Sequence, residues 1–227
     1  MSDTLENSLA DVRRRIRQAC ERAGREPDEV QLLAVSKTFP PETLRRAAAL
    51  GLHRLGESRV QEIRQKDNAL SDLQLEWVLI GHLQTNKAKD AARLVHEVQS
   101  LDRWPLAEAL DARLKLEQRT IDVLVQVKTS PEPSKFGLAP ADLPAFLDRL
   151  RSLATLRVKG LMTMAVHSPD ESAVRGCFHA LRELRDRMRA EGHELNRLSM
   201  GMSGDFEWAI QEGSTEVRIG SAIFGPR

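Results

Sequence analysis

The sequence has 227 residues, of which 41% are hydrophobic and 30% charged, so its length and composition fit one globular domain that buries its core without disulfide bonds. Its 34 basic and 33 acidic residues leave a net charge of +1, which provides no strong field to attract nucleic acid or an anionic membrane. We therefore expect a single domain over residues 1–227 that binds neither.

The N-terminal segment is predicted to be an amphipathic helix over about residues 3–24. Its apolar residues recur at steps of three and four, as in Leu5, Leu9 and Val12, and leave an arginine-rich face for solvent. Gly24 and Pro27 mark its end. The run 32–36 that follows is apolar on both faces, which is typical of a strand in a parallel sheet covered by helices.

The pattern of a short apolar segment, a loop and an amphipathic helix then repeats along the chain. Helices are expected at residues 41–50, 105–117, 141–150 and 171–190, among others. With the first strand, the candidate strands number eight; the other seven are residues 53–55, 77–80, 95–101, 121–127, 156–161, 195–199 and 216–219. Eight such units in about 200 residues predict an α/β fold, a single (β/α)₈ TIM barrel over about residues 30–225, with the N-terminal helix as an addition.

Lys37 comes directly after the first predicted strand. The carboxyl ends of barrel strands carry the active sites of this fold, and the period of two places Leu33, Val35 and Lys37 on one face. An amine in the barrel mouth could react with an aldehyde. The alternative that the residues alone leave open is a solvated lysine at a strand end.

The segments after the last two predicted strands both carry glycine and serine. Gly201, Met202 and Ser203 follow the seventh strand, and Gly220 with Ser221 follows the eighth. These two loops form the recurrent phosphate site of such barrels, although ordinary turns have the same composition. Ser203 is also expected to cap the helix that runs through residue 211.

Arg218 alternates with apolar neighbours on the eighth predicted strand, so its side chain should enter the barrel. A buried arginine needs a partner. It could form a structural ion pair with Glu216, or its fixed charge could face the ring nitrogen of a pyridine cofactor.

Other candidates for chemistry are weaker. The six histidines are scattered, and the pair His96-Glu97 is interpreted as a surface or strand-end feature. Cys20 and Cys177 are isolated, so no metal site is expected. The phosphate-loop, dinucleotide-binding and serine-hydrolase motifs are also missing from the sequence.

We expect a cytoplasmic location. No apolar run approaches the roughly 20 residues that span a bilayer, and no secretory signal is visible. Acidic residues such as Asp3 and Glu6 in the first helix are unlike an organelle-targeting segment. Two isolated cysteines suit a reducing compartment.

Five segments carry a resemblance to a known family. They are residues 34–38 (AVSKT), 55–57 (LGE), 80–87 (IGHLQTNK), 160–164 (GLMTM) and 198–225. Together they resemble the pyridoxal phosphate homeostasis proteins. This family is similar to the N-terminal barrel of alanine racemase, which belongs to the fold-type III class of enzymes that use pyridoxal phosphate (PLP). The match is collinear from about residue 32 to residue 225.

This resemblance implies that PLP is the cofactor, and it assigns roles to residues. Lys37 would form the Schiff base, and Arg218 would face the pyridine nitrogen and keep it largely unprotonated. The phosphate would be held by Ser203, Gly220 and Ser221, with backbone from Gly201 and Met202. Further candidates for cofactor contact are Ser58, Asn86, Ser199, Met200 and Lys135.

The chain departs from the family pattern at three places near the expected site. Ser58 stands where the family usually has asparagine, Val78 where it commonly has histidine, and Lys128-Thr129-Ser130 where relatives often read Asn-x-Ser. Lys135, in the irregular loop 129–135, matches a family lysine thought to take part in cofactor transfer. A solvated loop lysine is the alternative interpretation.

The resemblance implies a protein that binds, buffers and delivers PLP to apo-enzymes, without robust catalysis. Alanine racemase takes its second acid–base group from a tyrosine of another domain, whereas this sequence contains no tyrosine and ends directly after its eighth predicted strand. A monomer with an open cofactor site is therefore expected. Two enzymatic alternatives remain, a weak fold-type III racemase or decarboxylase and a cofactor-free Schiff-base aldolase, both using Lys37.

Overall fold

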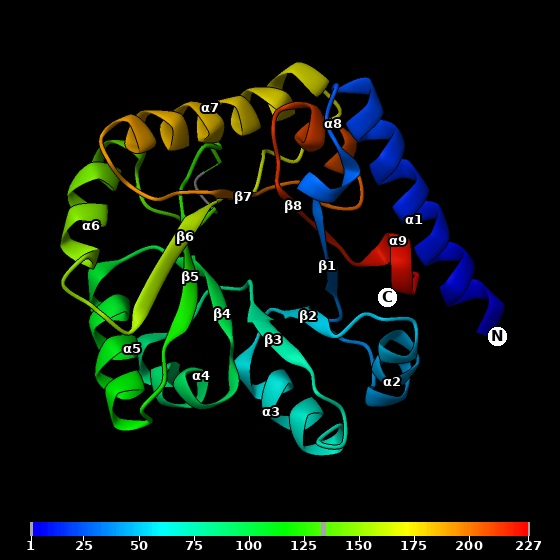
Figure 1. Cartoon of the computed structure of the whole chain (residues 1–227), viewed down its shortest axis with the longest axis horizontal. Helices are drawn as coiled ribbons and strands as arrows, with labels where there is room; N and C mark the ends of the chain where they lie inside the picture. Colours follow the sequence, from blue (N-terminus) through cyan, green and yellow to red (C-terminus); the bar gives the residue numbers. More distant parts are fainter. Residues whose placement is uncertain (1, 133–134, 227) are drawn as a thin grey trace.

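The strands form a closed parallel barrel in the order β1 to β8, and the helices surround it (Figure 1). The computed structural model describes residues 2–132 and 135–226. The strands are β1 Gln31–Val35, β2 Arg54–Glu57, β3 Glu76–Leu79, β4 Glu97–Leu101, β5 Ile121–Gln126, β6 Leu156–Met162, β7 Arg197–Ser199 and β8 Glu216–Ile219. Closure comes from the pairing of β1 with β8, in which Leu32 lies opposite Val217. The predicted (β/α)₈ TIM barrel is confirmed.

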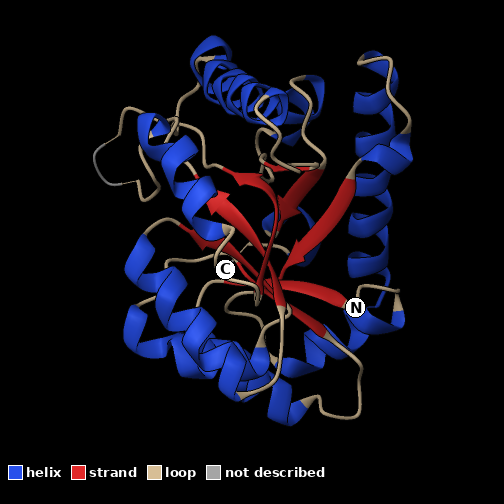
Figure 2. Ribbon diagram, turned by 60° about the vertical axis from the view of Figure 1, so that its left-hand side comes forward, coloured by secondary structure: helices blue, strands red, loops and turns tan. Residues whose placement is uncertain are grey.

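A shell of helices covers the outside of the barrel (Figure 2). Most strand residues are buried because side chains of one face of each strand fill the barrel and those of the other face contact this shell. The helices are α1 Ser2–Arg22, α2 Pro41–Ala49, α3 Val60–Ala69, α4 Ala88–Leu94, α5 Trp104–Leu116, α6 Leu143–Leu150, α7 Glu171–Ala190, α8 Phe206–Gln211 and α9 Ser221–Phe224. Short 3-10 helices η1 Pro27–Glu29, η2 Thr85–Lys87 and η3 Pro140–Asp142 complete the set of described elements.

The predicted N-terminal helix is present as α1, which packs on α8 and α9 (Figure 1). Its apolar residues Leu9 and Val12 are almost fully buried, and Arg15 donates a hydrogen bond of 2.8 Å to Glu207. Gly24 adopts a φ of +64°, a conformation in which glycine avoids the cost of a Cβ atom. The helix therefore ends where the sequence predicted.

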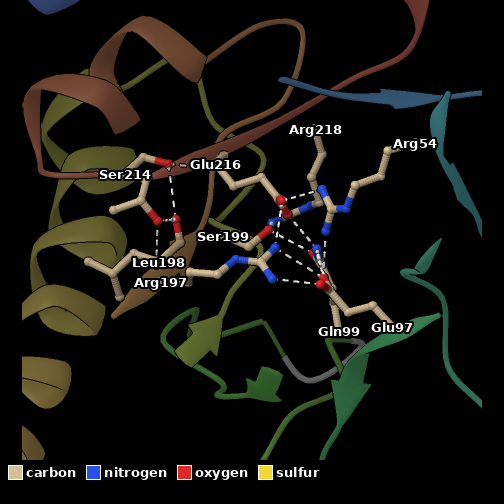
Figure 3. A network of polar contacts seen from close by, with 10 residues as sticks. Arg54, Glu97, Gln99, Arg197, Leu198, Ser199, Ser214, Glu216 and Arg218 are labelled. Carbon is tan, nitrogen blue, oxygen red and sulfur yellow. Dashed lines mark hydrogen bonds and ion pairs between the residues drawn. The ribbon is translucent and has the colours of Figure 1, made fainter. Parts of the chain in front are cut away.

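The interior of the barrel contains an ion network that the sequence did not predict. It consists of Arg54, Glu97, Arg197 and Glu216, which lie on four different strands (Figure 3). Glu97 is only 4% exposed, so its interpretation as a surface residue is wrong, although it does begin β4. Glu97 can be buried because two arginines that are distant in sequence, Arg54 and Arg197, neutralise its carboxylate inside the barrel.

Two local predictions need correction. Strands β4 and β7 begin two residues later than expected, because Val95 and Leu195 pack as buried residues before the pairing of the strands starts. Ser203 does not cap α8; Asp205 precedes that helix and accepts a hydrogen bond of 2.6 Å from the N–H of Met202. The hydroxyl of Ser203 instead accepts a hydrogen bond from the N–H of Ala222.

Two residues of the expected loop 129–135, Pro133 and Ser134, lie outside the described residues. Within residues 2–132 and 135–226, no helix combines the length and apolar character needed to cross a membrane.

Candidate functional site

A cavity of about 590 Å³ lies at the carboxyl ends of the barrel strands. The segments that follow β1, β2, β3, β5, β6, β7 and β8 line it, together with the ends of strands β1, β5, β6 and β8 and parts of helices α7 and α8. Its lining includes the predicted site residues Lys37, Ser58, Met202, Ser203, Arg218, Gly220 and Ser221. Residues from both halves of the sequence thus meet at the end of the barrel where this fold carries its active sites.

Lys37 lies two residues beyond β1, half-buried, and lines the cavity together with Val35. Its turn is held from below by helix α3. The Nζ of Lys66 donates 2.9 Å to the carbonyl of Ser36, and the N–H of Thr38 donates 3.0 Å to Oε2 of Glu62. These contacts hold Thr38 at a φ of +72°, which is costly for a β-branched residue and needs such support.

The loops after β7 and β8 form another wall of the cavity. Within the described chain, the backbone N–H groups of Ser203, Gly204 and Gly220 donate no hydrogen bond to another protein group. A Cβ atom on Gly220 would lie 3.1 Å from the carbonyl oxygen of Val35, so a side chain there would press on β1. This wall offers unpaired donors that suit an anion.

Arg218 lies on β8, and its side chain lines the cavity. It is 4% exposed, and its guanidinium donates to Oγ of Ser199 (2.7 Å) and to the carbonyl of Thr163 (2.8 Å). Among the described residues it forms no ion pair with Glu216 or another acid; burial lowers the pKa of Arg218 to about 10, which still leaves it cationic at neutral pH. A buried cation with neutral partners thus faces the cavity.

Five other predicted residues do not line this cavity. Gly201 and Met200 are buried behind the wall, and Ser199 is buried beneath Arg218. Asn86 is exposed in η2, and Lys135 lies in the loop after β5, where its Nζ is 3.8 Å from a carboxylate oxygen of Glu132.

The three departures from the family pattern differ in their place. Ser58 lines the cavity, whereas Val78 is fully buried in β3. The hydroxyl of Thr129 lies 2.9 Å from that of Thr163, the residue whose carbonyl accepts from Arg218.

Sequence reasoning missed an aromatic pair at the cavity. The rings of His82 and Phe136 stack with their centroids 4.1 Å apart, and both residues line the cavity. Phe136 is 52% exposed, so the pair borders the opening. The position of His82 just beyond a strand end could have pointed to it, but Phe136 lies in an irregular loop that carries no comparable signal.

Among the described residues, no three histidine, cysteine or acidic side chains lie close enough together to hold a metal ion. Both cysteines are buried thiols. The polar groups that line the site include one amine, one guanidinium, serine hydroxyls, backbone N–H groups, the imidazoles of His82 and His167, the amide of Gln126, the indole of Trp208 and the carboxyl group of Asp205.

Comparison with known proteins agrees with this arrangement. The family described as alanine racemase, N-terminal domain, matches residues 8–227. A pyridoxal phosphate homeostasis protein of Aquifex aeolicus is 45% identical over 220 residues, which cover 96% of each chain. The solved structure of PipY from Synechococcus elongatus with PLP bound has a TM-score of 0.87 at 36% identity, covering 97% of this chain and all of that one.

The barrel also resembles alanine racemase of Clostridium difficile, with a TM-score of 0.80 at 13% identity; the match covers 99% of this chain and 57% of the racemase. That likeness shows the shared fold alone. The sequence identity to the homeostasis proteins of Aquifex aeolicus and Pseudomonas aeruginosa is much higher, 45% and 42% over nearly the full length. The chain belongs to the pyridoxal phosphate homeostasis protein family.

Proposed function

We propose that this protein binds PLP in the cavity at the carboxyl end of the barrel and keeps the cofactor available to other proteins. One observation carries the proposal: Lys37, Arg218 and the unpaired N–H groups of the 203–204 and 220 turns line the same cavity. An amine, a buried cation and a cluster of hydrogen-bond donors for an anion are the groups that a pyridine ring with an aldehyde and a phosphate requires.

Each of these residues would contact a different part of the cofactor. Lys37 would attach to the aldehyde carbon, and Ser203, Gly204, Gly220 and Ser221 would hold the phosphate. Arg218 would face the ring nitrogen. Gly201 and Met200 would act by shaping the 201–204 turn, since they do not line the cavity.

We infer a carrier and not an efficient enzyme. Bound PLP supplies an aldehyde that condenses with amines and a ring that withdraws electrons. A racemase needs acid–base groups on both sides of the reacting carbon, and this sequence supplies no tyrosine for the second side. The cavity is lined by two apolar side chains that are also exposed to solvent, Phe136 (52%) and Met202 (39%). Their exposure supports an open cavity entrance through which the cofactor exchanges with apo-enzymes. We propose that the protein binds and exchanges PLP as a monomer in the cytoplasm.

Borohydride reduction of the purified protein loaded with PLP tests this assignment. Mass spectrometry should find the added mass on the peptide that contains Lys37, and Lys37→Ala should lose both the adduct and the visible absorbance. The variant should remain folded, because a half-buried side chain at a strand end contributes little stability. An adduct of equal yield in Lys37→Ala, or none in the unaltered protein, would contradict the proposal.

The carrier role has its own measurement. Loaded protein should transfer PLP to an apo-enzyme and restore its activity, while alanine is not racemised at an enzymatic rate. Rapid stereoinversion of an amino acid would support the racemase alternative instead.

A further inference from the structure

The interior ion network lies close to Arg218, which lines the candidate cofactor site (Figure 3). Glu97 accepts hydrogen bonds from Arg54 (2.8 Å) and Arg197 (2.6 Å), and Glu216 accepts from the same two arginines, each at 2.6 Å. The two carboxylates and two guanidinium groups therefore neutralise one another. This network explains the burial of its own members but does not by itself reach the cavity.

Gln99 connects this network to the residues above it. Its side chain is fully buried, and its Nε2 donates to Oε1 of Glu97 at 2.7 Å and also to Oε1 of Glu216 (Figure 3). Because both partners are carboxylate oxygens, which only accept, the amide nitrogen of Gln99 must face them. The amide oxygen of Gln99 must then face the opposite way, towards Ser199.

The orientation passes on to Ser199 and to Arg218. The hydroxyl of Ser199 lies 2.7 Å from the amide oxygen of Gln99, so it donates its single hydrogen there. Its lone pairs are left to accept the N–H of Arg218, also at 2.7 Å. Each step permits one direction of hydrogen bonding, so donation runs from the guanidinium of Arg218 through Ser199 and Gln99 to the carboxylates.

We propose that Gln99 is a positioning residue, which acts through Ser199 to fix the guanidinium of Arg218 against the cofactor cavity. The inference rests on the function proposed above. The charges of Glu216 and Asp205 attract Arg218, but it donates a hydrogen bond to no acidic side chain among the described residues, so its orientation depends on Ser199 and on the carbonyl of Thr163. Neither Gln99 nor Ser199 lines the cavity, and both therefore act on the cofactor through Arg218.

Two variants test the relay. Gln99→Met keeps the volume of the side chain but removes the acceptor for Ser199, and Ser199→Ala removes the acceptor for Arg218. Both should weaken binding of PLP by about 3- to 10-fold, the effect of one lost hydrogen bond. Both should also shift the pH at which the absorbance of the bound cofactor changes, since Arg218 would no longer hold one position beside the ring.

A double-mutant cycle separates positioning from a merely structural role. In an Arg218→Met background, Gln99→Met should change the affinity less than about twofold, because the residue through which it acts is gone. The matched control is Thr155→Val, which deletes another buried hydroxyl, bonded at 2.7 Å to Asp111 on the outer side of the barrel. It should lower stability without changing affinity or spectrum.

The outcomes are distinct. If Gln99→Met and Ser199→Ala bind PLP with the affinity and pH profile of the unaltered protein, the inference is wrong even though the proposed function stands. An equal loss of affinity from Gln99→Met with and without Arg218 would likewise overturn it. If the unaltered protein fails to bind PLP, the proposed function and this inference fall together.

Discussion

Gly201 shows how one residue shapes the turn beneath the proposed phosphate site. Its φ is +95°, and a Cβ atom there would lie 2.6 Å from Cβ of Ala209 and 2.9 Å from Cα of Phe206. We predict that Gly201→Ala lowers the free energy of unfolding by about 2–4 kcal/mol, because left-handed backbone strain and overpacking both add to the cost. Urea unfolding without cofactor measures this.

Gly204, three residues further along the same turn, is the matched control. A Cβ atom at Gly204 meets nothing within 4 Å, and its φ is not in the left-handed region. Gly204→Ala should therefore change the unfolding free energy by no more than about 0.5 kcal/mol. Equal stability of the two variants would show that the space and backbone angle at Gly201 have been misjudged.

Local sequence signals located some of the residues that line the cavity but not the buried charges of the barrel interior. Lys37 and Arg218 were placed correctly at the cavity because position relative to a strand end decides which residues reach the barrel mouth. The environment of Glu97 could not be predicted in this way, since its partner Arg197 is 100 residues away in sequence. Nothing in the segment around Gln99 distinguishes it from a solvent-facing glutamine.

Helix α3 anchors the turn that carries Lys37. Lys66 is 6% exposed and donates to Oε1 of Glu57 (2.7 Å) as well as to the carbonyl of Ser36. Burial raises the pKa of Glu57, against the opposing hydrogen bonds from Lys66 and Ser36, and Oε2 of Glu57 has no hydrogen-bond partner within residues 2–132 and 135–226. The turn, the strand β2 and the helix α3 are thus coupled through one buried ion pair.

Removal of Lys66 should therefore affect both stability and the site. We predict that Lys66→Met lowers the free energy of unfolding by about 3 kcal/mol, because it leaves a buried carboxyl without its cation. Loss of the bond to Ser36 should also loosen the turn and reduce the yield of the borohydride-reducible adduct on Lys37. Chemical unfolding and quantitative mass spectrometry measure the two effects.

Lys115 provides the comparison on another helix. It pairs with Asp111 one turn away on α5, but its side chain is 60% exposed. Lys115→Met should cost no more than about 0.5 kcal/mol and leave the adduct yield unchanged. A Lys66→Met variant that behaves like Lys115→Met would mean that α3 does not anchor the turn.

The repeat of strand and helix along the chain was enough to predict a closed barrel. Closure pairs β1 with β8 and so brings the segment after residue 35 beside Gly220, whose missing side chain leaves room for the carbonyl of Val35. The sequence could not show that the barrel is filled partly by charge. Residues such as Arg54 and Arg197 begin their strands and look solvent-facing, and only closure of the barrel places them together.

The interior ion network should make the stability of the barrel depend on pH in a defined direction. Burial alone would raise the pKa of Glu97, but its hydrogen bond from Arg197 and the charges of Arg54 and Arg197 outweigh burial and hold the pKa below its ordinary value. A carboxyl with a lowered pKa stabilises the fold above its unfolded pKa of about 4.3, and this contribution is lost as the pH falls through the folded value. The unaltered protein should therefore lose stability below about pH 4.5.

Arg197→Met should reverse part of that dependence. Among the described residues, the variant leaves the two buried carboxylates with Arg54 as their one remaining arginine partner, so we predict a loss of about 3–5 kcal/mol at pH 7. Burial should then raise the pKa of Glu97, and protonation should relieve the variant as the pH falls towards 5, so its deficit relative to the unaltered protein shrinks with acid. Arg157→Met, which breaks a pair with Asp122 at a 53% exposed arginine, should cost at most about 1 kcal/mol. Urea unfolding at pH 7 and pH 5 distinguishes the cases, and a deficit of Arg197→Met that stays constant over this range would show that the charge of Glu97 is not what Arg197 stabilises.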